Sequence, residues 1–140
     1  MKSRNVAYVA ATGLVVFAFT ASGVMDLLQP PAIRETMSSL GYPFYVATLL
    51  GVWKLLGAAA IGAPRLARLK EWAYAGMVFD LSGAAFSHAA AGDAVGKIVT
   101  PLVLLALVAT SWALRPASRT LPAPAEVKPA RGFGQAAAAT

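Results

Sequence analysis

The chain has 140 residues, of which 58% are hydrophobic and only 13% are charged. Soluble domains carry about 25% charged residues, so this composition excludes a surface that faces water on all sides. The net charge of +6 would suit nucleic acid in a soluble protein, but the basic residues form three short blocks between apolar runs, a pattern typical of membrane topology and not of a nucleic-acid-binding face.

Four apolar segments predict membrane-spanning helices, at about residues 6–28, 42–63, 72–91 and 95–114. Each approaches the ~20 residues that an α-helix needs to cross ~30 Å of hydrocarbon, where backbone polar groups must be satisfied within the segment. The first segment could instead be a secretory signal peptide, but its apolar run exceeds the usual length of about 7–15 residues. We therefore expect a retained helix and an all-α fold, an integral membrane four-helix bundle.

The connection between the first two spans, DLLQPPAIRETMSSLGYP, is longer than a turn. Residues 32–40 can form a short amphipathic helix after the two prolines, with Ile33, Met37 and Leu40 on one side. Such a helix could lie at the membrane surface and cover the bundle, or it could be an ordinary connection.

Lysine and arginine are distributed unequally between the two sides of the predicted bundle. Only Arg34 and Lys97 lie in the two loops on one side. Nine lie at the amino end, in the loop after the second span and in the tail, namely Lys2, Arg4, Arg65, Arg68, Lys70, Arg115, Arg119, Lys128 and Arg131. Because basic residues concentrate on the cytoplasmic side, we expect both termini in the cytoplasm (N-in/C-in) of a multi-pass protein of the cell membrane.

The chain divides into a predicted four-span domain, residues 1–115, and a basic tail rich in proline and alanine, residues 116–140. The tail has no apolar periodicity, and its prolines interrupt any helix. We expect cytoplasmic disorder there, or order only through contact with a partner. Its basic residues could touch anionic lipid headgroups or act only as a topological anchor.

Two opposite charges interrupt the second and third spans at similar depth. Lys54 lies ~13 Å from the cytoplasmic end of its span, and Asp80 lies ~12 Å from the cytoplasmic end of the next. An isolated charge at that depth costs several kcal/mol, whereas opposite charges can neutralise one another. We therefore predict that Lys54 and Asp80 both point into the bundle, at each other.

Small residues accompany both charges at helical spacing, where they let helices approach closely in lipid. Around Lys54 and Asp80 respectively, these are Ala47, Gly51 and Ala58, and Gly76, Gly83, Ala84 and Ser87. The sequence leaves two interpretations of the pair open. It fixes the register of the helices, or it lines a polar cavity that holds a ligand or moves a proton.

His88 is the only histidine, and it follows Asp80 by eight residues, so it lies on the same flank about 12 Å further outward. That is close to the level of Asp26, at the end of the first span. Asp26 and His88 could form a carboxylate–imidazole pair able to act as acid and base near neutral pH. Alternatively, His88 is an interfacial histidine that hydrogen-bonds to a neighbour.

Metal and cofactor motifs are absent from the sequence. One histidine does not make a zinc site, which needs three or four protein ligands, although one axial haem ligand would be possible. There is no phosphate-binding glycine loop or nucleophile elbow, and no cysteine for disulfides or metal centres. We expect no metal, and any redox chemistry must come from a cofactor or partner.

Three stretches resemble the DoxX-like four-helix membrane proteins, over about residues 8–115. They are GYPFYVATLLGVWKLLGAAAI, RLKEWAYAGMVFDLSGAAFSHAAAGD and the proline-containing span that follows. The most specific motifs are KLLGA and KEWAYAG…SH…GD, carried by Lys54, Gly57, Lys70, Glu71, Trp72, Tyr74, Gly76, His88, Gly92 and Asp93. Founding relatives are associated with a quinol-oxidising terminal oxidase complex, and others with membrane redox partners, so the resemblance implies a quinone. Asp80 has no assigned place in the family pattern.

Three functions follow as hypotheses. The chain is an accessory or ligand-binding component of a quinone-linked membrane redox assembly, with a membrane redox partner or a second copy of itself. Alternatively, it is a small membrane enzyme that uses acid–base chemistry to isomerise or hydrolyse a lipophilic substrate, or a transporter that must oligomerise. The expected ligand-binding residues, in a pocket between helices, are Trp53, Lys54, Tyr74, Asp80 and His88.

Overall fold

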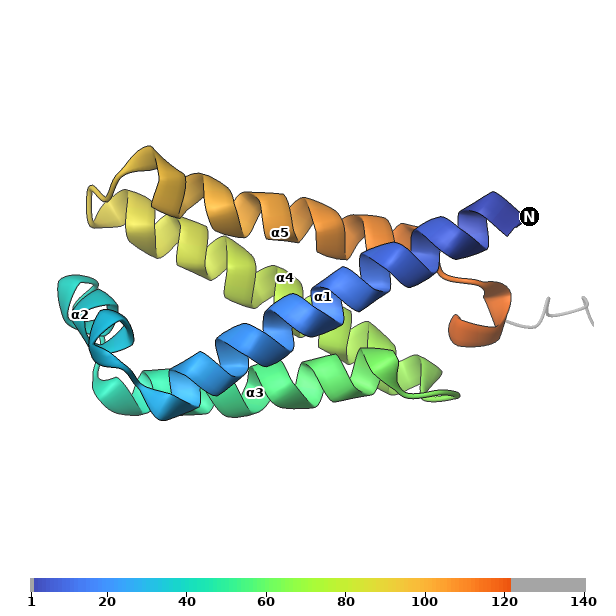
Figure 1. The fold of residues 1–140 in the computed structure, drawn as a ribbon, viewed down its shortest axis with the longest axis horizontal. Helices are drawn as coiled ribbons and strands as arrows, with labels where there is room; N and C mark the ends of the chain where they lie inside the picture. Colours follow the sequence, from blue (N-terminus) through green and yellow to red (C-terminus); the bar gives the residue numbers. More distant parts are fainter. Residues whose placement is uncertain (1, 122–140) are drawn as a thin grey trace, which may run out of the picture.

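The computed structural model describes residues 2–121, and every regular element within them is helical (Figure 1). In chain order the elements are α1 (Lys2–Leu28), α2 (Pro31–Ser39), α3 (Phe44–Gly62), α4 (Ala67–Ala90), α5 (Val95–Ala113) and the 3-10 turn η1 (Ala117–Arg119). The predicted all-α class is confirmed. The expectation of a disordered tail concerns residues 116–140, of which residues 122–140 lie outside the described part of the chain.

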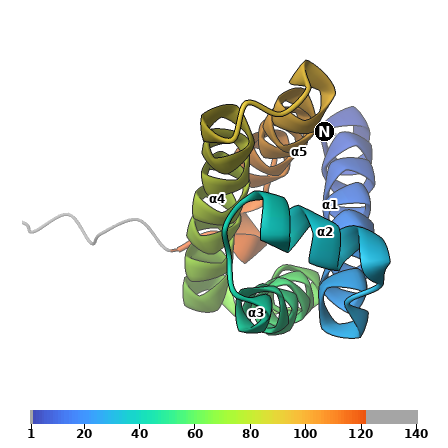
Figure 2. The same ribbon diagram turned by 90° about the vertical axis from the view of Figure 1, so that its left-hand side faces the viewer.

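The four long helices run alternately in opposite directions, and α1 and α4 each pack against both α3 and α5. The amino end, the α3–α4 connection and the end of α5 lie together at one end of the bundle (Figure 1). The short α2 lies across the other end, which we call the α2 end and which faces the viewer in Figure 2. Helix α2 occupies the stretch in which the sequence predicts an amphipathic helix.

Three of the helices are long and apolar enough to cross a membrane: Ser3–Leu28, Phe44–Gly62 and Val95–Ala113, each with a mean hydropathy of 1.7. Helix α4 is 24 residues long but includes Arg68, Lys70, Glu71 and Asp80, and it is not among the three. Large apolar side chains nevertheless cover its outside, since Phe79 and Phe86 are both 75% exposed. Such an apolar exterior is expected of helices that lipid surrounds.

Lys70 is completely buried and holds the corner between α3 and α4. Its ammonium group donates hydrogen bonds to the carbonyl oxygens of Ala60 (2.9 Å), Ile61 (2.8 Å) and Ala63. These carbonyl groups belong to the last turn of α3 and to the residue that follows it. Carbonyl oxygens at a helix end lack partners within the helix and carry a partial negative charge. Lys70 therefore caps α3 from the neighbouring helix, although by sequence it counts only as a loop cation.

The tightly packed part of the core lies toward the end opposite α2. It consists of Val15, Phe19, Ala58, Ile61, Tyr74, Met77, Leu81 and Val108. A buried polar network crosses it, in which the Ser111 hydroxyl shares hydrogen bonds with Thr12 (2.7 Å) and Tyr74 (2.8 Å). The network satisfies these hydroxyl groups and ties α1, α4 and α5 together.

Candidate functional site

Two glycines bring α1 and α3 into backbone contact. A Cβ atom added at Gly51 would lie 2.8 Å from the carbonyl oxygen of Gly23 and 3.1 Å from the Cβ of Asp26. A Cβ atom added at Gly23 would likewise lie 3.1 Å from the Cβ of Lys54. Each charged residue thus packs over the glycine of the opposite helix, and the crossing places Asp26 beside Lys54.

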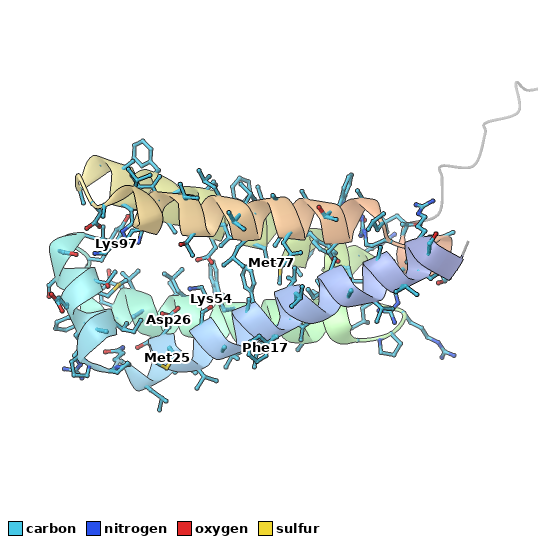
Figure 3. All side chains as sticks on the ribbon, turned by 45° about the horizontal axis from the view of Figure 1, so that its top comes forward. Phe17, Met25, Asp26, Lys54, Met77 and Lys97 are labelled. Atoms are coloured by element: carbon cyan, nitrogen blue, oxygen red, sulfur yellow. The ribbon has the colours of Figure 1, made fainter. Side chains whose placement is uncertain are left out.

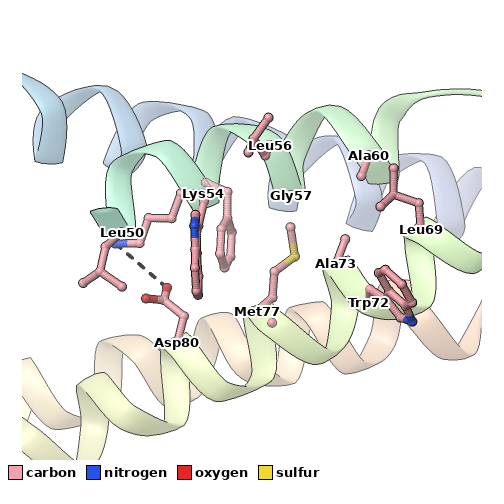
Figure 4. A pocket seen from close by; sticks show the side chains of 13 residues that line it. Leu50, Lys54, Leu56, Gly57, Ala60, Leu69, Trp72, Ala73, Met77 and Asp80 are labelled. Atoms are coloured by element: carbon pink, nitrogen blue, oxygen red, sulfur yellow. Dashed lines mark ion pairs between the residues drawn. The ribbon is translucent and has the colours of Figure 1, made fainter. Parts of the chain in front are cut away.

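Lys54 is the centre of a charged cluster with two carboxylates, Asp26 and Asp80. Its Nζ lies 2.7 Å from Asp26 Oδ2, a hydrogen-bond distance, and 3.9 Å from Asp80 Oδ2 (Figures 3 and 4). The three side chains come from α3, α1 and α4 and are 18%, 9% and 16% exposed respectively. One ammonium group therefore faces two largely buried carboxylates.

The pairing differs in detail from the one expected on depth alone. Side chains on a helix lean toward its amino end, so Lys54 leans toward the α2 end of the bundle and Asp26 leans away from it. The two meet across the α1–α3 crossing, which makes Asp26 the nearer partner of Lys54 and leaves Asp80 at the longer distance. Of the two interpretations of His88, the structure favours a histidine that hydrogen-bonds to a neighbour, since His88 contacts Asp93 while Asp26 bonds to Lys54.

His88 forms its close contact with Asp93 in the α4–α5 connection. Nδ1 of His88 lies 2.7 Å from Asp93 Oδ2, and Lys97 Nζ lies 3.0 Å from the other carboxylate oxygen. The hydrogen bond from His88, together with Lys97, holds the pKa of Asp93 below its usual range. Gly92 has φ +70°, a conformation that glycine adopts without strain, and it turns the chain so that Asp93 reaches back to α4.

Three cavities adjoin the charged cluster, and Lys54 and Asp80 line all three. The lateral groove, about 350 Å³, lies between α3 and α4 (Figure 4). The inner cavity, about 370 Å³, lies between α1, α4 and α5 and is also lined by Thr36 of α2 and Lys54 of α3. The roof cavity, about 380 Å³, lies beneath α2. His88 lines the inner and roof cavities, so it shares both with the cluster.

Helix α2 covers the roof cavity with its apolar side. Ile33, Met37 and Leu40 all line this cavity, and Met37 is buried. The hydroxyl of Tyr42, just after α2, shares a 2.8 Å hydrogen bond with that of Ser87 in α4. Of the two interpretations of this segment, the structure favours a cover over an ordinary connection.

The glycines near Asp80 have a different role from the one expected. The sequence pattern predicts that they let helices approach closely, but a Cβ atom at Gly76 or Gly83 would meet nothing within 4 Å. Gly76 lines the lateral groove and Gly83 lines the roof cavity. These two positions therefore leave open space beside Asp80, whereas Gly23 and Gly51 are the true contact glycines.

The two aromatic residues of the predicted ligand set lie in different places. Trp53 is 63% exposed and lines the lateral groove together with Trp72. Tyr74 is instead buried in the Thr12–Ser111 network, with the guanidinium group of Arg115 5.0 Å from its ring centre. Tyr74 precedes Asp80 by six residues, about one and two-thirds turns, so the two point to different sides of α4.

The side chains around the cavities do not form a metal-ligand set. Among residues 2–121, no three His, Asp or Glu side chains gather closely enough to hold a metal ion. Sequence reasoning named Asp93 only as a motif residue and Lys97 only as a loop cation, and it missed that both belong to one cluster with His88. The Gly92-Asp93 pair at the end of α4 is the signal that could have identified them, because a glycine turn returns the next residue toward the helix.

A family model described as the DoxX-like family matches residues 10–111. No curated protein and no solved structure matches the chain.

Proposed function

Since the chain belongs to the DoxX-like family, we propose that it is a ligand-binding component of a quinone-linked redox assembly in the cell membrane. The observation that carries the proposal is the lateral groove, which is lined mostly by apolar residues, Trp53 and Trp72 among them, together with Lys54 and Asp80. An apolar groove with a few polar groups at its inner end is typical of sites for lipophilic molecules with a polar head.

In the proposed topology all four long helices cross the membrane, with both termini in the cytoplasm. Helix α4 supplies the remaining span, residues 72–91, since its exposed phenylalanines suit lipid while Asp80 turns inward toward Lys54. The α2 end then faces outward, in line with the excess of lysine and arginine at the opposite end.

The residues of the lateral groove fit a quinone headgroup. Quinone carbonyl oxygens accept hydrogen bonds, and the ammonium group of Lys54 is a donor at the inner end of the groove. The rings of Trp53 and Trp72 provide flat apolar surface toward the lipid. A bound quinone would supply two-electron redox chemistry, which this chain lacks by itself. Electrons would come from a membrane redox partner, and a second copy of the chain is the other partner to test.

Tryptophan fluorescence offers a direct test, because quinones quench nearby indole rings. The full chain in detergent is titrated with a ubiquinone analogue that carries a decyl chain. We expect saturable quenching, and about tenfold weaker binding for Lys54→Met, the loss of one charge-assisted hydrogen bond. Trp112→Phe is the matched control, since Trp112 bonds to Glu71 outside the groove. Quenching without saturation, equal in wild type and Lys54→Met, would overturn the proposal.

A small membrane enzyme remains the second proposal, favoured by the cavities that His88 shares with Asp80 and Lys54. These groups could exchange protons with a lipophilic substrate during isomerisation or hydrolysis. Mass spectrometry of lipids that co-purify with the protein separates the two proposals. Bound quinone supports the first, whereas a substrate together with its isomer or hydrolysis product supports the second.

A further inference from the structure

The charged cluster has two carboxylates and one lysine, so it carries one negative charge more than Lys54 neutralises when both carboxylates are ionised. Lys54 is committed to Asp26 by a 2.7 Å hydrogen bond, whereas its 3.9 Å separation from Asp80 is beyond hydrogen-bond range. Two nearby carboxylates repel each other when both are ionised, so one of them readily takes up a proton. Asp80 is the less well compensated of the two.

We propose that Asp80 is the proton-exchanging group of the cluster. The His88–Asp93 pair, which we call the port, transfers protons between Asp80 and water at the α2 end. This inference concerns the chain's own residues and does not require the ligand proposed above. It gives His88 and Asp93, which lie outside the charged cluster, a role in the proton exchange of that cluster.

The first support is a shared space between the port and the cluster. His88 and Asp80 line both the inner cavity and the roof cavity, of about 370 and 380 Å³. A water molecule occupies about 30 Å³ of liquid, so either cavity has room for a short chain of water molecules. Such a chain can span the ~12 Å that eight residues of helix place between the two side chains.

The second support is the orientation of the imidazole. An ionised carboxylate accepts hydrogen bonds only, so Asp93 fixes the proton of a neutral His88 on Nδ1 and leaves Nε2 as the acceptor. Among the described residues, Nε2 makes no hydrogen bond. His88 can thus take a proton at Nε2 from a hydronium ion, which becomes water, and as the imidazolium ion release it from Nε2 through the water chain to Asp80. The N–H bond breaks as an O–H bond forms, which leaves a neutral imidazole and a carboxylic acid.

The charges around the port suit this exchange. Asp93 Oδ2 lies 2.7 Å from His88 Nδ1, and Lys97, which is 52% exposed, marks the side that faces water. The other titratable groups on the roof cavity are Asp26, Lys54 and Tyr42, from α1, α3 and the connection before α3. Lys54 and Asp26 form the closer pair, so they offset each other's field at His88.

Infrared spectroscopy of the full chain in lipid nanodiscs tests the assignment of Asp80. We expect a protonated-carboxyl band whose intensity changes with pH, which disappears in Asp80→Asn and persists in Asp26→Asn. A band that does not respond to pH, or one that Asp26→Asn removes, would overturn the assignment. Neither result depends on quinone binding, so the outcome is distinct from that of the fluorescence titration.

A pH jump followed by the same band tests the port. A positioned proton-transfer group accelerates transfer by about 100-fold, so His88→Gln should slow the response at least ~10-fold, and Asp93→Asn should slow it as well. Added imidazole should restore the rate of His88→Gln, a rescue that a purely structural defect would not show. Ser82→Ala is the control, because its exposed hydroxyl bonds only within α4. An unchanged rate in His88→Gln, or a slow rate that imidazole does not restore, would overturn the port.

Discussion

Gly23 and Gly51 face each other where α1 crosses α3, and no side chain larger than hydrogen fits at Gly51 without a shift of backbone. The carbonyl oxygen of Gly23 would lie 2.8 Å from a Cβ atom there. Because the cluster forms at this crossing, the separation of the two backbones also sets the distance between Lys54 and Asp26.

The first prediction concerns this crossing. Gly51→Ala should lower the free energy of unfolding by about 1–3 kcal/mol, the usual cost of overpacking, despite the higher helix propensity of alanine. Gly13→Ala is the matched control: a Cβ atom there meets nothing within 4 Å, so the change should be neutral or stabilise by up to about 1 kcal/mol. Melting temperatures in detergent measure both. Equal effects of the two substitutions would show that the two helices are not in close contact at Gly51.

Periodicity and length predict the helices well, because a segment in lipid must satisfy its backbone hydrogen bonds internally and therefore has few alternatives to a helix. The same reasoning identifies α2, since two prolines before an amphipathic stretch and a glycine after it mark the ends of a helix. It also brings Lys54 and Asp80 into one region, because depth along a helix follows directly from residue count.

Depth does not determine which neighbour is closest, and sequence reasoning failed on this point. Asp26 lies at the end of the first span, so counting residues pairs it with His88 and not with Lys54. The deciding factors are the close α1–α3 contact and the lean of side chains along their helices. A retrospective signal exists in the spacing, since Gly23 and Gly51 each precede a charged residue by three positions.

The second prediction concerns the ion pair between Glu71 and Arg115, 2.8 Å apart at the end opposite α2. Both residues lie just outside the proposed spans, residues 72–91 and 95–114. The hydrogen bond from Arg115 lowers the pKa of Glu71, so the pair stabilises the folded state above the ordinary pKa of glutamate, and this stabilisation is lost as the pH falls through the lowered value. Glu71 is partly exposed, so we expect only about 1 kcal/mol.

A comparison with Glu71→Gln across a pH series measures this contribution. The melting temperature of wild type should exceed that of the variant at neutral pH, and the difference should close in acid. Glu35→Gln serves as the control, because Glu35 is an exposed residue of α2. A difference that widens on acidification would contradict the expected direction of the pKa shift.

The third prediction concerns the lysine that caps α3. Lys70→Met should cost at least ~2 kcal/mol, because three carbonyl oxygens of the α3 terminus lose a charged donor. Arg68→Met removes the same charge from an exposed position two residues earlier, and a surface change of this kind stays within about 0.5 kcal/mol. Similar losses for both variants would mean that net charge, and not the cap, is responsible.

The fourth prediction tests the proposed topology. The chain has no cysteine, so single cysteines at the exposed positions Ser38 and Ser118 can be labelled separately. An impermeant maleimide applied to intact cells should label Ser38→Cys on α2 and leave Ser118→Cys unlabelled until the membrane is opened. The reverse pattern would place both termini outside. Labelling of both positions would mean that one of the four proposed spans does not cross the membrane.

The last prediction separates the two partners of Lys54. Lys54→Met leaves two carboxylates without their cation, at a cost of about 3–5 kcal/mol if both stay ionised. A second substitution that removes a carboxylate should restore part of this loss, and the coupling is the effect of the double variant minus the effects of the two single variants. Because Asp26 makes the 2.7 Å bond and Asp80 the 3.9 Å contact, Asp26→Leu should restore more stability than Asp80→Leu in the Lys54→Met background. Equal restoration by both substitutions would show that Lys54 is shared evenly between the carboxylates, and strict additivity would show that neither faces it.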